Sequence, residues 1–214
     1  TTDFNGSLDN ITVKAITGIS QPNLVFLDDA GSVAVEARGN LSLLNTFIGK
    51  DSGRSNTSGN YNTGFGTNAL YSNTTGFYNT ALGSEALYSN TTGYGNNAIG
   101  YQSLYKNTTG ACFVAIGYQS MYNTIIGADT VAIGIWSLKN NTTGYGNAAI
   151  GAYSQMNSTT GDYNASVGYS TLYNNTTGYG NIAIGPRSLY VMKPTSKAIT
   201  AFADYGATVA GTVK

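Results

Sequence analysis

Residue types that carry much of enzyme chemistry are missing or scarce in this sequence. Among its 214 residues there is no histidine and a single cysteine, Cys112, and charged residues make up only 9%. Histidine is the usual general acid or base near neutral pH, and one cysteine cannot form an intrachain disulfide bond. The acidic residues of the central region do not recur at a common position, so they predict no metal site: Asp51, Glu85, Asp129 and Asp162. We therefore expect no enzymatic activity, no catalytic residue, no cofactor and no metal ion.

The charge balance and the lack of long apolar runs argue against two further classes of partner, nucleic acids and membranes. Ten basic residues are matched by ten acidic ones, so the formal net charge is zero. A nucleic-acid-binding domain would show a basic patch or stripe. No apolar run approaches the roughly 18 residues that a membrane-spanning helix needs. The sequence predicts neither a nucleic-acid partner nor membrane insertion.

Glycine, by contrast, is abundant and regularly spaced. It recurs every 17 residues without insertion or deletion, at Gly49, Gly66, Gly83, Gly100, Gly117, Gly134, Gly151, Gly168 and Gly185. A second series follows ten residues later, at Gly59, Gly76, Gly93, Gly110, Gly127, Gly144, Gly161 and Gly178. A fixed period of this length is typical of repeat architectures.

Residues 17 positions apart form a column, and the columns show strand spacing. Directly before the first glycine series, every residue is apolar, from Ile48 to Ile184. From Ala81 onward small residues precede that column, and a mixed column that admits valine and isoleucine precedes them. This alternation predicts a strand. A second apolar column lies four residues after the glycine, with Gln155 as its polar member, and predicts a second short strand: Leu70, Leu87, Leu104, Met121, Leu138, Leu172 and Leu189. Turns rich in asparagine, threonine and glycine separate the strands.

These patterns predict an all-β fold, a parallel β-solenoid with one coil per 17-residue repeat. Coils stacked at about 4.8 Å would build a rod roughly 40 Å long. We expect the solenoid to cover residues 45–190. Residues 1–44 are expected to form an N-terminal β cap or connector, with strands at 11–17, 24–27 and 32–36. Residues 191–214 are expected to form a C-terminal β segment, which includes strand-like stretches at 200–205 and 207–210, or the start of a following domain.

Two columns of the first strand receive opposite predicted roles. The large apolar column is expected to face the core of the coil, represented by Ile99, Ile116, Ile133, Ile150 and Ile184. Alternation then directs the small column away from that core. Small side chains let neighbouring backbones approach closely, so this column is the predicted trimer interface: Ala81, Ala98, Ala115, Ala132, Ala149 and Ala183.

A tyrosine column follows the leucine column and is expected to face outward. It is a candidate binding stripe, a subunit interface, or simply a stable sheet surface: Tyr71, Tyr88, Tyr105, Tyr122, Tyr173 and Tyr190. The nearby Asn-Thr-Thr segments match glycosylation sites. Because they hold one position in coil after coil, we expect their side chains to bond the backbone or each other instead: Asn73, Asn90, Asn107, Asn141 and Asn175.

One coil departs from the pattern, with Thr124-Ile125-Ile126-Gly127 in place of Asn-Thr-Thr-Gly. The period is kept there, so the turn should keep its length. We expect Ile125 or Ile126 to be buried, under a neighbouring segment or at a subunit contact.

The units Asn45–Gly49, Asn79–Gly83, Asn96–Gly100 and Val114–Gly117 resemble the head repeats of trimeric autotransporter adhesins of the YadA type. They are equally similar to repeats of phage tail fibres and related surface fibres. The resemblance implies a left-handed parallel β-roll, with three chains side by side and the small column near the trimer axis.

Together these features predict a structural and adhesive fibre module, of a phage tail fibre or a similar surface appendage that binds a host cell. The expected partners are further copies of the chain in a homotrimer, a host-surface glycan or protein, and other fibre or virion proteins. The expected location is the virion or the cell exterior. A filament-forming protein without a receptor role and an autotransporter adhesin head remain alternatives. An ice-binding solenoid is disfavoured, because adjacent threonines point to opposite faces of a strand.

Overall fold

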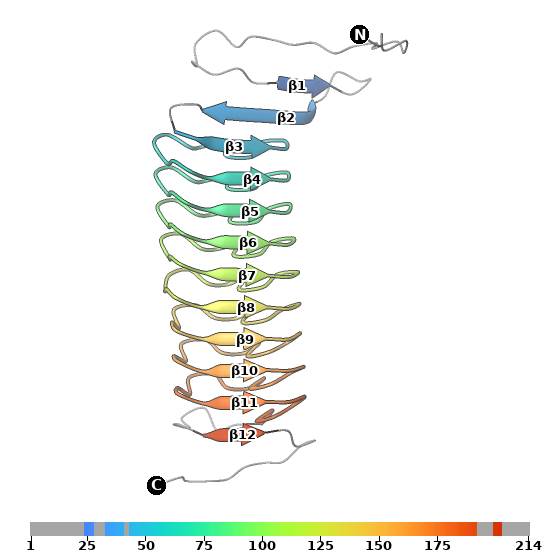
Figure 1. The fold of residues 1–214 in the computed structure, drawn as a ribbon, viewed down its shortest axis with the longest axis vertical. Helices are drawn as coiled ribbons and strands as arrows, with labels where there is room; N and C mark the ends of the chain where they lie inside the picture. The colour runs from blue at the N-terminus through green and yellow to red at the C-terminus, as the bar shows by residue number, and fades with distance from the viewer. Residues whose placement is uncertain (1–23, 28–32, 41–42, 192–198, 203–214) are drawn as a thin grey trace.

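The computed structural model describes residues 24–27, 33–40, 43–191 and 199–202. Within these residues it is all-β, without a helix, and forms a rod of stacked coils (Figure 1). Twelve strands make one sheet, in which spatial order follows chain order from β1 to β12. Strands β3 to β12 pair in parallel, and from β3 to β11 partners lie 17 residues apart, as in Ala98 with Ala115 and Ala115 with Ala132. The predicted parallel β-solenoid is therefore confirmed, whereas its left-handed winding stays a prediction.

Two strands precede the coils and pair antiparallel. β1 (Leu24–Leu27) pairs with β2 (Val33–Asn40), and β2 pairs with β3, so the chain reverses twice before the first coil. The predicted pairing of segments 24–27 and 32–36 is confirmed. The strands expected at 11–17 and 207–210 lie outside the described residues.

Each coil contributes one strand of three or four residues. They are β3 (Asn45–Ile48), β4 (Thr63–Phe65), β5 (Thr80–Leu82), β6 (Asn97–Ile99), β7 (Val114–Ile116), β8 (Val131–Ile133), β9 (Ala148–Ile150), β10 (Ala165–Val167), β11 (Ile182–Ile184) and β12 (Thr200–Phe202). The last strand pairs with β11 in an 18-residue register, Ile182 opposite Thr200. The sheet thus continues past residue 190, where the repeat was expected to end.

The second predicted strand of each repeat is wrong. The segment with the leucine column is a series of turns, and its leucines have left-handed backbone, with φ of 52° at Leu104. The coils still bond each other there, because the Leu104 amide donates to the Ser120 carbonyl at 3.0 Å. A strand needs extended dihedrals, which a left-handed residue in each coil interrupts.

The glycine after each strand is required by the approach of the next coil. Gly117 has φ of +133°, and a Cβ added there would lie 2.5 Å from the Gly134 carbonyl oxygen. Only glycine takes that conformation readily, and any side chain would also meet fixed backbone. The 17-residue glycine series therefore marks a backbone-to-backbone contact between coils.

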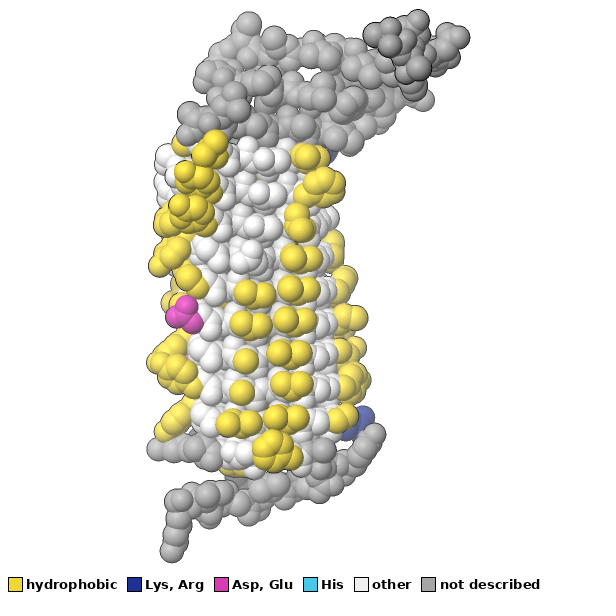
Figure 2. All heavy atoms as spheres, viewed as in Figure 1, with side chains coloured by type: hydrophobic (Ala, Val, Ile, Leu, Met, Phe, Trp, Pro, Cys, Tyr) yellow, Lys and Arg dark blue, Asp and Glu magenta, His cyan; other side chains and the backbone are white. Residues whose placement is uncertain are grey.

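The prediction that the isoleucine column faces the core is wrong. These side chains point outward and are exposed or half-exposed, at 37% for Ile99 and 42% for Ile184, and the same holds for Ile116, Ile133 and Ile150. Figure 2 shows the outward face of the sheet as two vertical rows of apolar side chains in the C-terminal half and one in the N-terminal half.

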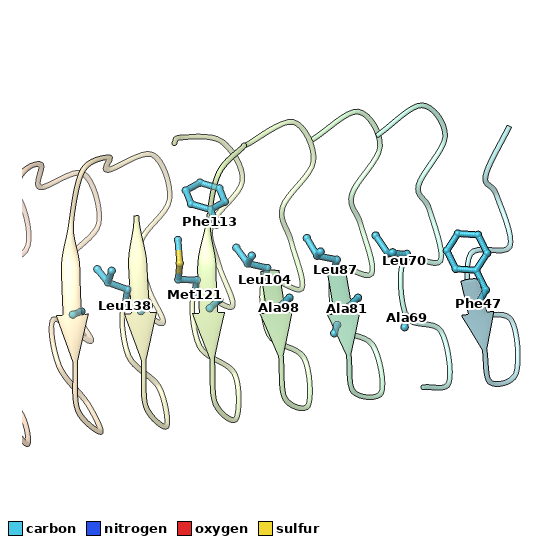
Figure 3. Close-up of a cluster of buried hydrophobic side chains, with 14 residues drawn as sticks. Phe47, Ala69, Leu70, Ala81, Leu87, Ala98, Leu104, Phe113, Met121 and Leu138 are labelled. Carbon is cyan, nitrogen blue, oxygen red and sulfur yellow. The ribbon is translucent and has the colours of Figure 1, made fainter. Parts of the chain in front are cut away.

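The alanine column is the inward one, so its predicted role as the trimer interface is wrong as well. Every member is fully enclosed by its own chain, at 0% exposure, and cannot touch another chain: Ala81, Ala98, Ala115, Ala132, Ala149 and Ala183. The leucines of the turn segments and these alanines belong to one cluster of buried side chains that fills the narrow interior, in which Figure 3 labels Leu70, Leu87 and Leu104. With one large side chain already inside each coil, the strand can supply only a small one.

The remaining interior is polar and hydrogen-bonded in a repeating way, apart from the Thr124 and Ser158 hydroxyls and the Gln155 side-chain oxygen. The residue before each strand is usually a buried asparagine, such as Asn79, whose amide donates to the Gly93 carbonyl at 2.8 Å. Its carbonyl oxygen accepts from the backbone amide of Asn96 at 3.1 Å. Buried serines add bonds to the strands, for example from Ser103 to the Ala115 carbonyl at 2.8 Å. Such satisfied columns let polar groups be buried without the usual cost of desolvation.

Candidate functional site

The side chains that fill the interior are buried, so candidate binding sites lie on the outer surface. In the described residues no three histidine, cysteine, aspartate or glutamate side chains gather as metal ligands would. Those same residues contain no helix long and apolar enough to cross a membrane. The outer surfaces are the sheet face, the two edges where the chain turns away from the sheet, and the wall of turns that carries the tyrosine column.

The sheet face carries no charged residue between β3 and β11. From β7 to β11 both outward positions are apolar, as in Val114 with Ile116 and Ile182 with Ile184. Nearer the N-terminus one position is polar, as in Thr80 beside Leu82. A parallel sheet is normally covered on both faces, whereas nothing in the described chain covers this one. We refer to the outward side chains of β3 to β12 as the sheet face.

The Asn-Thr-Thr asparagines behave as expected from their repeated position. Asn90 is fully buried, and its amide donates to the Asn73 side-chain oxygen at 2.8 Å and to the Gly93 carbonyl at 3.0 Å. Asn107 continues the ladder by donating to Asn90 at 2.8 Å. The predicted structural role is confirmed, and these amides are inaccessible to glycosylation in the folded chain.

The tyrosine column lies on the outer surface, half-exposed, but its rings cover each other. Tyr71, Tyr88, Tyr105 and Tyr122 stack in sequence with centroids 5.0 to 5.1 Å apart. Tyr173 and Tyr190 stack separately at 5.0 Å, since Lys139 and Met156 interrupt the column. At the N-terminal end the Arg54 guanidinium lies 5.8 Å from the centre of the Tyr71 ring. The column offers mainly ring edges and hydroxyl groups, and its binding role stays a prediction.

A hydrogen-bonded ladder of side chains runs along the edge where each strand ends. The Trp136 indole donates to Gln119 at 3.0 Å, Gln119 donates to Gln102 at 2.6 Å, and Gln102 donates to the Glu85 carboxylate at 2.7 Å. In each of these bonds the donor lies one coil after the acceptor, and the last acceptor of the series is the Glu85 carboxylate. We call Glu85, Gln102, Gln119 and Trp136, with the adjacent Tyr101 and Tyr118, the aromatic–amide strip.

The two tyrosines of the strip are more exposed than those of the tyrosine column. Tyr101 is 42% exposed and stacks on Tyr118 at 5.4 Å. Desolvation and then the Glu85 carboxylate raise the pKa of Tyr101, and the same two causes raise the pKa of Tyr105. One carboxylate therefore lies near the hydroxyl groups of both aromatic columns, with the amide ladder between them.

The aromatic–amide strip was not predicted from the sequence. Its signal was present, because Glu85, Gln102, Gln119 and Trp136 are hydrogen-bonding residues at successive positions of one column. Side chains in such a column meet at the distance between coils, about 4.8 Å between backbones, so long polar side chains can bond directly.

The opposite edge, where each strand begins, is also aromatic. Tyr61 stacks on Tyr78, and Phe77 stacks on Tyr94, each at 4.9 Å. Cys112 lies in the same column as Tyr78, as a free and exposed thiol.

In the irregular coil, the side chains of Ile125 and Ile126 are 45% and 46% exposed. The prediction that one is buried under a neighbouring segment is wrong for the single chain, and burial at a subunit contact stays a prediction.

No family model matches the chain, and no curated protein or solved structure matches it either.

Proposed function

We propose that this chain is a rigid structural module of a surface fibre, such as a phage tail fibre, which associates side by side with further copies of itself. The sheet face supports the proposal. Its apolar side chains form a strip along the rod, about 40 Å long, that is one residue wide from β3 to β6 and two residues wide from β7 to β11. The largest exposed apolar patch of a soluble protein is often an interaction site.

The sheet face fits a second copy because it is long, straight and uncharged. Isolated sheet surfaces usually carry charged residues that oppose association, and β3 to β11 have none in their outward positions. The resemblance to trimeric fibres favours three chains around a common axis, an arrangement in which each rod needs only a narrow strip at the centre. The trimer contact is therefore proposed at the isoleucine column and its neighbours rather than at the alanines.

Mass measurement tests the assembly. Light scattering of the parent should give a multiple of the 22.3 kDa chain, with three copies expected. Ile150 and Ile184, two coils apart and 41% and 42% exposed, are replaced together by glutamate. Charges introduced at the interface should leave a folded single chain.

The matched control is Thr109→Glu with Thr143→Glu, which adds the same charges at the same two-coil spacing on an exposed turn away from the sheet. The control should keep the mass of the parent. A parent that is a single chain at high concentration, or a sheet-face variant with the parent's mass, contradicts the proposal.

The host-binding part of the function requires a surface that assembly leaves free. A filament protein without a receptor role would show the same lateral association and bind no host molecule. The two alternatives differ only in ligand binding, so the outer edges of the rod decide between them.

A further inference from the structure

Side-by-side assembly through the sheet face does not use the aromatic–amide strip. Gly100 separates the outward Ile99 from Tyr101, and there the chain turns off the sheet. The strip combines half-exposed amides, exposed phenol rings and one carboxylate along successive coils. This combination of rings and neutral hydrogen-bonding groups lies outside the interior of the coil, which the alanine, leucine and asparagine columns fill.

We infer that the strip binds an uncharged, hydroxyl-rich oligosaccharide, with one sugar ring on Tyr101 and the chain of sugars along the amide ladder. This inference rests on the proposed role as a surface fibre module. It names the ligand class and the residues that recognise it.

Ring faces decide where a sugar can stack. Sugar rings present C–H groups that pack against an aromatic face, so a face already covered by another ring is not available. In the tyrosine column each ring covers the next. In the strip, Tyr101 stacks on Tyr118 on one side, but the preceding position of its column is Ser84, which carries no ring. The side of Tyr101 towards Ser84 is therefore the candidate platform.

The groups beside this platform suit sugar hydroxyls. Each glutamine amide of the ladder uses one N–H and one acceptor position for its neighbour, which leaves a second N–H and a second lone pair for a ligand. The Glu85 carboxylate accepts from Gln102 and has lone pairs to spare. A hydroxyl group both donates and accepts, so it can pair with each of these groups. The coil spacing of about 4.8 Å repeats the amides at close to the length of one sugar in an extended chain.

The same groups fit other polymers poorly. A nucleic acid would need several free cations, whereas the ladder ends in a carboxylate and the nearby Lys139 ammonium lies 4.4 Å from the centre of the Trp136 ring. A peptide could add to a free backbone edge, but the backbone N–H groups here already have partners. Those of Gln102, Gln119 and Trp136 donate to the backbone carbonyls of Ser84, Tyr101 and Tyr118 respectively. These observations leave an uncharged ligand that forms hydrogen bonds with the side chains only.

An array of immobilised neutral oligosaccharides of glucose, galactose, mannose and N-acetylglucosamine, with heparin fragments and single-stranded DNA beside them, tests the inference on the assembled full chain. The parent should bind at least one neutral sugar. With the best soluble oligosaccharide, calorimetry should show affinity reduced at least about ten-fold by Tyr101→Ala and by Gln102→Asn. Asparagine tolerates the left-handed backbone at Gln102, φ 53°, but is too short to keep the bond to Glu85.

The matched control is Tyr94→Ala, because Tyr94 is 44% exposed and also stacks on one ring, that of Phe77, at the opposite edge. It should bind the sugar within about two-fold of the parent. Binding to heparin or DNA alone, binding to nothing, or equal losses in Tyr94→Ala and Tyr101→Ala overturn the inference. Mass separates the two proposals: a trimer that binds no sugar rejects only the strip, and a single chain that binds sugar through Tyr101 rejects only the assembly.

Discussion

Replacing Ala115 with aspartate should destabilise the rod far more than replacing its neighbour Ile116 with the same residue. Ala115 is fully enclosed, stacked between Ala98 and Ala132, and its carbonyl accepts from Ser103 at 2.8 Å. An aspartate there would place a carboxylate among apolar atoms with no partner. Burying an unpaired charge costs several kcal/mol, so Ala115→Asp should lose at least about 3 kcal/mol of unfolding free energy.

Ile116 lies next in the chain but outside the coil. Its side chain is already half-exposed, so its removal costs about half of the 1.5–3 kcal/mol assigned to complete burial, and aspartate adds up to about 1 kcal/mol of unfavourable strand propensity. The expected loss for Ile116→Asp is therefore about 1–2 kcal/mol. The difference between the two variants should reach at least about 1–2 kcal/mol.

Urea unfolding followed by circular dichroism measures both values. The variants are compared in the Ile150→Glu/Ile184→Glu background, so that loss of assembly by Ile116→Asp does not enter the result. Each background charge is at least two coils, about 9.6 Å, from Ile116 and is largely screened at moderate salt. Equal losses for the two variants, or a larger loss for Ile116→Asp, would refute the inward orientation of the alanine column.

Three further outcomes follow from the stacking of coils. Gly117→Ala should lower the unfolding free energy by at least about 2 kcal/mol, because its Cβ would meet the Gly134 carbonyl oxygen at 2.5 Å. Gly95→Ala should lower it by about 1 kcal/mol, because Gly95 has φ of 66° and the atom nearest to an added Cβ lies 3.5 Å away. Equal melting temperatures for the two variants would contradict this. Asn90→Ala breaks a buried ladder and should lose about 2–4 kcal/mol, against about 0.5 kcal/mol for the exposed Thr92→Ala, both by urea unfolding. Glu85→Gln should lower the pKa of Tyr101 and Tyr105, because the carboxylate raises both. A tyrosine whose pKa is raised on folding contributes stability that is complete below pH about 10 and is lost as the pH rises through the folded pKa. The variant should therefore lose less stability over that pH range than the parent. An unchanged phenolate absorbance titration would refute the last outcome.

The period and the strand positions could be predicted because they depend on local backbone properties. A glycine every 17 residues and three alternating residues before it are enough to place each strand, and β4 to β11 each end directly before that glycine. The antiparallel pairing of β1 with β2 was predictable for the same reason. These features need no knowledge of what lies on either side of the sheet.

The direction of the strand faces was predicted wrongly because alternation shows two different faces without showing which is inside. Large apolar residues are usually the inward ones, and here the leucines of the turns occupy the interior instead. The sequence did contain a sign. Residues two apart share a face, and the isoleucine column shares its face with Thr63, Thr80 and Asn97, while Gly64 stands in the alanine column. Polar residues on the first face indicate that it is the outward one. The second column holds one large buried residue, Phe47, in a coil where Gly53 stands in place of leucine and lies against the Phe47 ring.

The coils that depart from the consensus support the same picture of a narrow interior. Phe113 replaces a buried asparagine, and its ring lies against Gly110 and Gly127. In the same region Thr124, which is smaller than asparagine, replaces another member of the buried ladder, and its hydroxyl has no partner. A larger side chain in one column is thus accompanied by a smaller one in the facing column, as conservation of core volume requires.

A second region shows the same exchange for polarity rather than size. Gln155 replaces a buried leucine, and the strand opposite carries Ser166 in place of alanine; the Gln155 amide donates to the Ser166 hydroxyl at 2.9 Å. The same amide also donates to the Ala148 carbonyl at 3.1 Å, whereas the buried carbonyl oxygen of the Gln155 side chain has no partner. The interior of each coil therefore constrains its columns jointly, whereas the outer columns vary from threonine to isoleucine and from tyrosine to lysine. Such a division lets the rod keep its geometry while its outer surface changes from coil to coil, which suits the proposed fibre module, its proposed packing against its own copies and the proposed recognition of a sugar.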